Sequence, residues 1–94
     1  MKIIETALQV LNDEIDGINL LKKFFDSNFE DAVKTIFNSN GKVVVTGVGK
    51  SGHVGRKISA TLSSTGTPSF FIHPTEASHG DMGMIEKNDV ILAI

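Results

Sequence analysis

The sequence predicts an α/β fold, a Rossmann-like parallel sheet with flanking helices, and three observations support this prediction. Three short runs of β-branched or aromatic apolar residues begin at Lys42, Ser69 and Asp89. A stretch with the apolar spacing of a helix separates the first two runs. The first run is apolar at consecutive positions, which is typical of a strand buried on both faces. Because strands joined by a crossover helix pair in parallel, we expect a parallel sheet.

The composition excludes several classes of protein. The 94 residues leave room for at most one small domain, and the net charge of -2 comes without a block of basic residues, so no nucleic-acid surface is indicated. The absence of cysteine excludes a disulfide framework and a thiolate metal site. The sequence starts without a signal-peptide pattern, and no apolar run approaches the length of a membrane span. We therefore expect a cytoplasmic protein with no membrane partner.

Residues 1–40 are expected to form two helices. In the first helix, apolar residues recur in steps of three and four at Ile4, Leu8, Leu11, Ile15 and Ile18, continuing to Leu21 and Phe25. This stripe fits a helix on its own domain and, equally, a helix against another subunit. Ser27 and Glu30 have the spacing of a capping box, which makes Ser27 the expected N-cap of the second helix. The residues of that helix expected to face inward are Phe29, Val33, Ile36 and Phe37.

Residues 41–94 are expected to hold three strands and a phosphate loop. The loop, 47–52, leads into a helix, which the recurrence of Val54, Ile58 and Leu62 every four residues indicates and which should end at Gly66.

The remaining strands are expected at 69–72 and 89–94, separated by a polar loop or short helix at 74–83. A buried strand normally leads into a turn and a covering helix. Because the last strand runs into the chain end, we expect the domain to be truncated after its third strand.

The glycine loop is the predicted phosphate site, because open parallel sheets bind ligands at the carboxyl ends of their strands. Its glycines allow the backbone to approach a ligand closely. The backbone N–H groups of Ser51, Gly52 and His53 would be free at the start of the helix, where the helix dipole favours an anion, and Lys50 adds a positive charge. The candidate phosphate-binding residues are Gly47, Gly49, Lys50, Ser51, Gly52 and His53. The alternative interpretation is a plain tight turn with a solvated lysine.

Two nucleotide-binding motifs fit this loop poorly. The spacing of its glycines matches the dinucleotide fingerprint, but that motif also needs an acidic residue at the end of the second strand, where Ile72 and His73 stand. The P-loop requires a glycine five positions before Gly49, and that position is Val44. A small phosphorylated ligand beside Lys50 is the interpretation that remains.

The polar loop after the second strand places His73, Glu76, His79 and Asp81 within nine positions. We expect Glu76 and His79 to face the same crevice as the glycine loop, with Asp81 able to orient His79, an arrangement suited to proton transfer. Three of them also have a structural interpretation: His73 as a strand-end histidine bonded to backbone, Glu76 as an acid at a helix start and Asp81 as a turn or N-cap residue. The histidine spacing matches no common zinc-ligand pattern, so no metal site is predicted.

Gly47–Lys57 resembles the phosphate loop of the sugar isomerase (SIS) superfamily, and Ser64–Pro74 with Glu76–Ile85 resembles its D-arabinose 5-phosphate isomerases. The resemblance implies a partial SIS domain over 1–94, with N-terminal helices at 1–40. It also implies an aldose–ketose isomerase that interconverts D-arabinose 5-phosphate and D-ribulose 5-phosphate without a cofactor. The reaction begins synthesis of the sugar acid Kdo for lipopolysaccharide or capsule. The family's enzymes are typically homotetramers that share active sites between subunits.

The resemblance further implies catalytic roles for Lys50 and His79, which match active-site residues of the family. A preorganised cation or donor would stabilise the enediolate intermediate, and Glu76 is a candidate base. After the position of Ile94 the family continues with a Ser-rich phosphate loop and further catalytic residues, so we expect the 94-residue chain alone to be inactive. Two alternatives stay open: a non-catalytic SIS module that binds a sugar phosphate, and a structural fragment that keeps only oligomer contacts.

Overall fold

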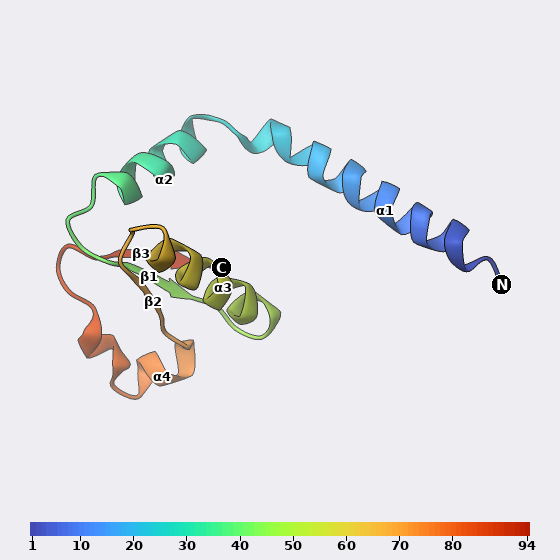
Figure 1. The fold of residues 1–94 in the computed structure, drawn as a ribbon. Coiled ribbons are helices and arrows are strands. Elements are labelled where there is room, and N and C mark those ends of the chain that lie inside the picture. The colour runs from blue at the N-terminus through green and yellow to red at the C-terminus, as the bar shows by residue number, and fades with distance from the viewer. The chain divides into compact units, whose positions relative to one another are not determined.

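The computed structural model describes all residues, 1–94, and contains helices and strands in the order shown in Figure 1. The elements are α1 (Ile3–Leu20), the 3₁₀ helix η1 (Leu21–Phe24), α2 (Ser27–Phe37), β1 (Val43–Thr46), α3 (Lys50–Ser64), β2 (Ser69–Phe71), α4 (Pro74–Ser78), the 3₁₀ helix η2 (Asp81–Met84) and β3 (Val90–Ala93). The chain divides into two compact units, Met1–Val33 and Lys34–Ile94. No helix is both long and apolar enough to cross a membrane.

The first unit consists of helices, and the predicted helix with its apolar stripe is confirmed in α1, where no residue is buried. The predicted N-cap of α2 is wrong. The backbone N–H groups of Asn28 and Phe29 both donate to Oδ1 of Asp26, at 3.0 and 3.2 Å, so Asp26 is the N-cap and Ser27 the first helical residue. An aspartate at this position satisfies two of the donors that a helix start leaves free.

The predicted inward face of α2 is only partly correct. Ile36 is half-buried, whereas Phe29, Val33 and Phe37 are exposed. Phe29 packs instead on the ring of Phe25 within its own unit, with ring centroids 4.8 Å apart.

The second unit contains a three-stranded parallel sheet in the order β2-β1-β3, as the sequence predicts. In its register, Val44 of β1 lies between Phe70 of β2 and Ile91 of β3. Val43, Val44 and Val45 are at most 1% exposed, which confirms a central strand buried on both faces.

The helix α3 packs on the sheet through small residues. Its buried residues are Gly52, Gly55 and Ser59, whereas Val54 is 54% exposed. A Cβ added to Gly55 would lie 3.1 Å from side-chain atoms of Phe71 and Val45. The helix therefore lies so close to β1 and β2 that only small residues fit between them. Ile58 and Leu62, the other two residues whose spacing predicted this helix, are half-buried.

The predicted end of α3 at Gly66 is confirmed. Gly66 has φ of +99°, and the N–H of Thr67 donates to the carbonyl oxygen of Leu62 at 2.9 Å. This six-to-one hydrogen bond is the mark of a Schellman motif, in which glycine takes the left-handed conformation at low cost.

The amino-terminal ends of β1 and β3 are joined by Asp89, whose side chain is 1% exposed. Its carboxylate accepts hydrogen bonds from the backbone N–H of Glu86 at 2.7 Å and of Lys42 at 2.8 Å. These two bonds, followed by the charge of Lys42, hold the pKa of Asp89 below its ordinary value. The Lys42 ammonium lies 3.1 Å from Glu86 Oε1, and this hydrogen bond is the main cause of the raised pKa of Lys42.

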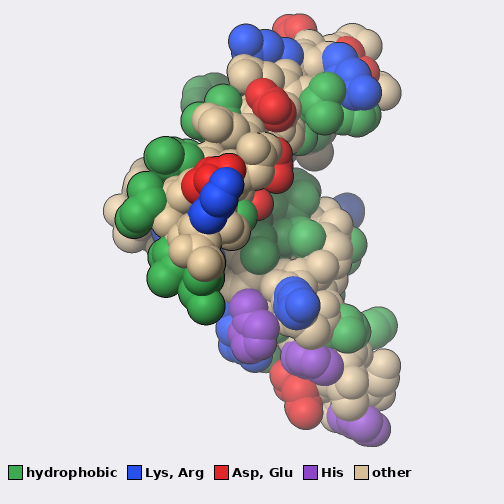
Figure 2. Space-filling model, turned by 90° about the vertical axis from the view of Figure 1, so that its right-hand side faces the viewer, with side chains coloured by type: hydrophobic (Ala, Val, Ile, Leu, Met, Phe, Trp, Pro, Cys, Tyr) green, Lys and Arg blue, Asp and Glu red, His purple; other side chains and the backbone are tan.

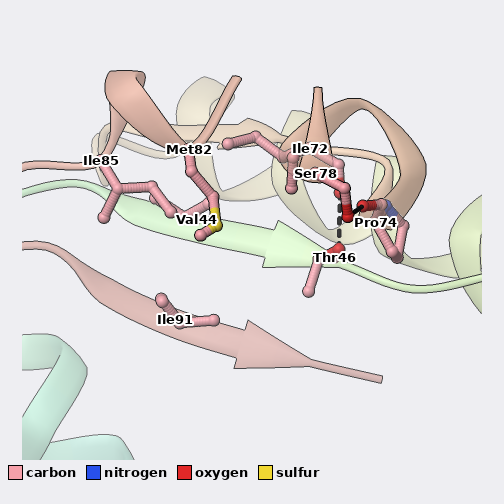
Figure 3. Close-up of a pocket in the computed structure, with 9 residues that line it drawn as sticks. Val44, Thr46, Ile72, Pro74, Ser78, Met82, Ile85 and Ile91 are labelled. Atoms are coloured by element: carbon pink, nitrogen blue, oxygen red, sulfur yellow. Dashed lines mark hydrogen bonds between the residues drawn. The ribbon is translucent and has the colours of Figure 1, made fainter. Parts of the chain in front are cut away.

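On the sheet face opposite α3, the segment containing α4 and η2 forms an apolar depression of about 360 Å³ (Figure 3). Val44, Thr46, Ile72 and Ile91 form its floor from the three strands, because side chains alternate between the two faces of a sheet. The remaining lining residues are Pro74, Ala77, Ser78, Met82 and Ile85.

Candidate functional site

The carboxyl ends of β1 and β2 are tied together, and both of the predicted functional loops begin there. Thr46 Oγ1 donates a hydrogen bond of 2.6 Å to the carbonyl oxygen of Ile72 (Figure 3). Thr46 leads into the glycine loop and Ile72 into the polar loop. This contact fixes the starting points of the two loops relative to each other.

The glycine loop is shorter than the sequence predicts, because α3 begins at Lys50 with Gly49 as its N-cap. Gly49 has φ of +61°, a backbone conformation that favours glycine. Gly47 and Gly52 are buried on either side of this turn.

The expectation of three free N–H groups at the helix start is wrong for two of them. The N–H of Gly52 donates to the carbonyl of Val48 at 3.4 Å, and that of His53 donates to the carbonyl of Gly49 at 3.2 Å. The helix starts early enough for these residues to complete its first turn. The N–H groups of Lys50 and Ser51 are left without a backbone acceptor and can bind an anion. The Lys50 side chain is exposed beside them.

A cavity of about 180 Å³ lies between the start of α3 and the end of β2. It is lined by Gly49, Gly52, His53, Arg56, Phe71 and His73. The glycine loop and the residue that opens the polar loop therefore meet at one cavity, as expected of the carboxyl ends of parallel strands.

Arg56 is the residue of this cavity that sequence reasoning missed. Its guanidinium carbon lies 4.3 Å from the centroid of the Phe71 ring, a cation–π contact. The available signal was its spacing: Arg56 follows Gly52 by four residues, which places both on one face of the helix. The contact with Phe71 depends on how α3 packs, which the local pattern does not reveal.

His73 has the structural role that the sequence offered as one interpretation. Its Nδ1 accepts a hydrogen bond from the backbone N–H of Thr75 at 3.1 Å, so His73 is the N-cap of α4. The ring also lines the cavity, and Nε2 is the nitrogen left for another partner.

Glu76 and His79 lie on the polar loop, exposed, in α4 and at its C-cap. Neither lines the cavity beside the glycine loop, and no hydrogen bond joins Asp81 to His79. Figure 2 shows histidine side chains on one face of the molecule, next to Lys or Arg side chains and carboxylates. That Glu76 and His79 act in the same crevice as the glycine loop remains a prediction.

No group of three or more histidine and carboxylate side chains is arranged to hold a metal ion. The ionisable groups of the two loops are the ammonium of Lys50, two imidazoles and the carboxylates of Glu76 and Asp81, a set suited to binding an anion and moving a proton.

Comparisons with known proteins show which family the sequence and the fold resemble. The family model of the SIS domain matches residues 35–94. The arabinose 5-phosphate isomerase KdsD of Yersinia pestis is 56% identical over 90 residues, covering 96% of this chain, and KdsD of Pseudomonas aeruginosa is 52% identical over 94 residues, covering all of it. The chain spans only 27% and 29% of these two relatives.

Among solved structures, that of E. coli CFT073 c3406 in complex with a sugar phosphate superposes with a TM-score of 0.89 at 42% identity. The match covers 98% of this chain and 49% of the other.

Proposed function

Because this chain belongs to the SIS domain family, we propose that it supplies part of a sugar-phosphate isomerase that interconverts D-arabinose 5-phosphate and D-ribulose 5-phosphate. The observation that most supports the proposal is the similarity to arabinose 5-phosphate isomerases along nearly the whole chain. Within the proposed domain, residues 1–40 are the N-terminal helices and residues 41–94 hold the first three strands with the phosphate loop.

In this proposal the glycine loop binds the ligand. Gly47, Gly49 and Gly52 let the backbone come close to it, and the free N–H groups of Lys50 and Ser51 favour an anion at the start of α3. The exposed ammonium of Lys50 adds a full charge at the same place. His53 lines the adjoining cavity and completes the proposed set of binding residues.

The reaction moves a carbonyl group between C1 and C2 of the sugar. A base removes the proton from the carbon next to the carbonyl, and the proton returns one carbon away after a cis-enediolate has formed. We assign stabilisation of the enediolate oxygen to Lys50 or His79, because a preorganised cation or donor lowers the barrier most where charge develops. Glu76, three residues before His79 on α4, is the candidate base.

Pathway, compartment and assembly extend the proposal by resemblance. The product would enter the synthesis of Kdo, the acidic sugar of lipopolysaccharide or capsule, in the cytoplasm. The active protein would be a homo-oligomer, a tetramer in the pattern of the family, and would use no cofactor.

One observation favours a second candidate, a non-catalytic SIS module that senses a sugar phosphate. The glycine loop adjoins a cavity, whereas Glu76 and His79 are exposed and do not line it. A binding module needs the first feature and not the second.

A chimeric enzyme separates the two candidates. Residues 1–94 replace the aligned segment of the Pseudomonas aeruginosa relative, and ketose formation from D-arabinose 5-phosphate is measured beside binding of the same sugar. An isomerase segment gives turnover comparable with the parent, and His79→Asn then lowers kcat without changing the melting temperature. Binding without turnover supports the sensing module. A folded chimera that does neither contradicts both candidates.

A further inference from the structure

We propose that the cavity between α3 and the end of β2 binds a phosphate group, with Arg56 as its principal cation. The inference rests on the proposed function in taking the ligand to be phosphorylated, and it adds a binding residue that neither the glycine loop nor the polar loop contains. The relevant chemistry is that of the cavity lining, which joins a guanidinium, two imidazoles and a glycine turn.

Arg56 is held in place by an aromatic ring. Its guanidinium carbon lies 4.3 Å from the Phe71 centroid, within the range of a cation–π contact. A guanidinium that lies over a ring keeps its N–H edge free, and that edge matches two oxygens of a phosphate. Because the ring already restricts the side chain, less conformational entropy is lost when a ligand binds.

The position of Phe71 is set by glycines in turn. A Cβ on Gly55 would lie 3.1 Å from the Phe71 ring, and a Cβ on Gly52 would lie 3.6 Å from it. Both glycines are buried residues of α3. The ring therefore occupies the space that Gly52 and Gly55 leave beside α3, and the guanidinium of Arg56 lies over it.

No carboxylate competes for Arg56. The lining of the cavity contains no Asp or Glu, and the ion pairs around Lys42 and Lys2 lie elsewhere in the chain. His73 accepts a hydrogen bond at Nδ1, so its neutral ring carries the proton on Nε2 and offers a donor. The lining thus presents donors to an anion and no opposing charge.

Phosphate fits this set of donors better than a ligand with only one acceptor atom does. Its several oxygens can accept hydrogen bonds from the guanidinium, the imidazole and the nearby loop at the same time. The bound group could be free inorganic phosphate or the phosphate group of a sugar phosphate, and the cavity would recognise both through the same hydrogen bonds. The experiment separates these sources.

The test is a titration of the isotope-labelled 94-residue chain, followed by nuclear magnetic resonance, with inorganic phosphate and separately with D-arabinose 5-phosphate. The signals observed are the side-chain N–H of Arg56 and the backbone N–H groups of Lys50 and Ser51. Arg56→Gln should weaken binding of the better probe by about tenfold or more, since a hydrogen bond to a charged partner is lost. Arg56→Lys should bind the probe more tightly than Arg56→Gln but more weakly than the parent. Lysine keeps the charge but lacks the planar pair of N–H donors and the stacking of a guanidinium on the ring.

Lys57→Gln is the matched control, because it removes the same charge from the neighbouring residue, whose ammonium contacts Thr61 at 3.3 Å. It should change the dissociation constant by no more than about twofold. Phe71→Leu keeps the arginine and removes the aromatic ring that it contacts. This variant should weaken binding more than Lys57→Gln does and less than Arg56→Gln does. Thermal melts show whether each variant is folded. If Phe71→Leu unfolds, the affinities of the variants at the exposed residue Arg56 are compared with that of the parent instead.

The outcomes separate this inference from the proposed function. Unchanged affinity in Arg56→Gln, or no response of the Arg56 signal to either probe, overturns the inference; if the sugar phosphate still shifts Lys50 and Ser51, the proposed function stands. A response of the Arg56 signal in the parent chain, together with weaker binding by Arg56→Gln, supports the inference. Tighter binding of the sugar phosphate then identifies it as the source, and equal affinity identifies inorganic phosphate; in the latter case the proposed substrate loses support.

Discussion

A Cβ added to Gly52 would lie 2.7 Å from the carbonyl oxygen of Gly47, so the first turn of α3 lies directly against the residue that leaves β1. Real side-chain carbons do not approach a backbone oxygen so closely, and the backbone atom cannot rotate away as a side chain can. The shape of the glycine loop is therefore fixed by backbone contact, before any ligand is present.

Gly52→Ala is expected to destabilise the protein by about 1 to 3 kcal/mol, the usual cost of overpacking, despite the gain in helix propensity. Gly17→Ala is the matched control within α1, where an added Cβ meets no atom within 4 Å. That variant should stabilise its helix by up to about 1 kcal/mol. Urea denaturation followed by circular dichroism measures both changes. Equal effects of the two substitutions would show that the contact with Gly47 is not restrictive.

Thr46→Val is expected to lower the free energy of unfolding by about 1 kcal/mol, because the shape of the side chain is kept and the hydrogen bond to Ile72 is lost. Thr61→Val serves as the control, since Thr61 is exposed and its hydroxyl accepts a hydrogen bond from the Lys57 ammonium at the surface. Denaturant melts compare the two. A loss no larger than that of the control would mean that the bond between the strand ends contributes nothing to stability.

Asp89 should make stability depend on pH at the acidic end. Its pKa is held below the ordinary value of 3.8, chiefly by the N–H of Glu86 and then by the N–H of Lys42. A depressed pKa contributes stability that is fully present above 3.8 and is lost as pH falls through the folded-state pKa. Asp89→Asn should be less stable than the parent at neutral pH, and the difference should shrink below that value.

The measurement is urea denaturation of both proteins across the acidic range, with Asp81→Asn as an exposed control of equal charge change. A parent–variant difference that stays constant across the range would contradict the linkage.

Lys50→Ala in the chimeric isomerase is expected to lower kcat by about a hundredfold or more, the magnitude typical of a lost transition-state contact. In the proposed site the N–H groups at the helix start remain available to the phosphate, so KM should change less. Steady-state kinetics with D-arabinose 5-phosphate separates the two parameters, and Lys57→Ala controls for charge. A rise in KM alone would reassign Lys50 to phosphate binding; near-normal values of both would remove it from the site.

The strands, the helix between them and its glycine stop were predictable because each depends on a local pattern. Three valines in succession indicate a buried strand, and Gly66 ahead of Pro68 indicates a helix end. The N-cap of α2 was assigned wrongly to Ser27, because Asp26 and Ser27 are both good capping residues and only the backbone path decides between them.

The face of α3 and the role of Arg56 were not predictable from the pattern, since both depend on how closely the helix approaches the sheet. A stripe of large apolar residues predicts the buried face of a helix when the helix axis lies at the ordinary distance from the sheet. Gly52 and Gly55 allow a closer approach, which turns Val54 outward and brings Phe71 beneath the guanidinium of Arg56. The roles of Glu76 and His79 depend on a ligand, so their test is kinetic.

The buried carboxylate of Asp89 anchors the sheet at its amino-terminal edge, where Lys42 and Glu86 also lie, whereas the glycine and polar loops leave the opposite edge. Substitutions in the two loops thus act at the opposite edge of the sheet from the hydrogen bonds of Asp89. Under the proposed function, residues of the loop edge that make no packing contact like that of Gly52 can change with the ligand, while the bonds of Asp89 at the other edge continue to join β1 to β3.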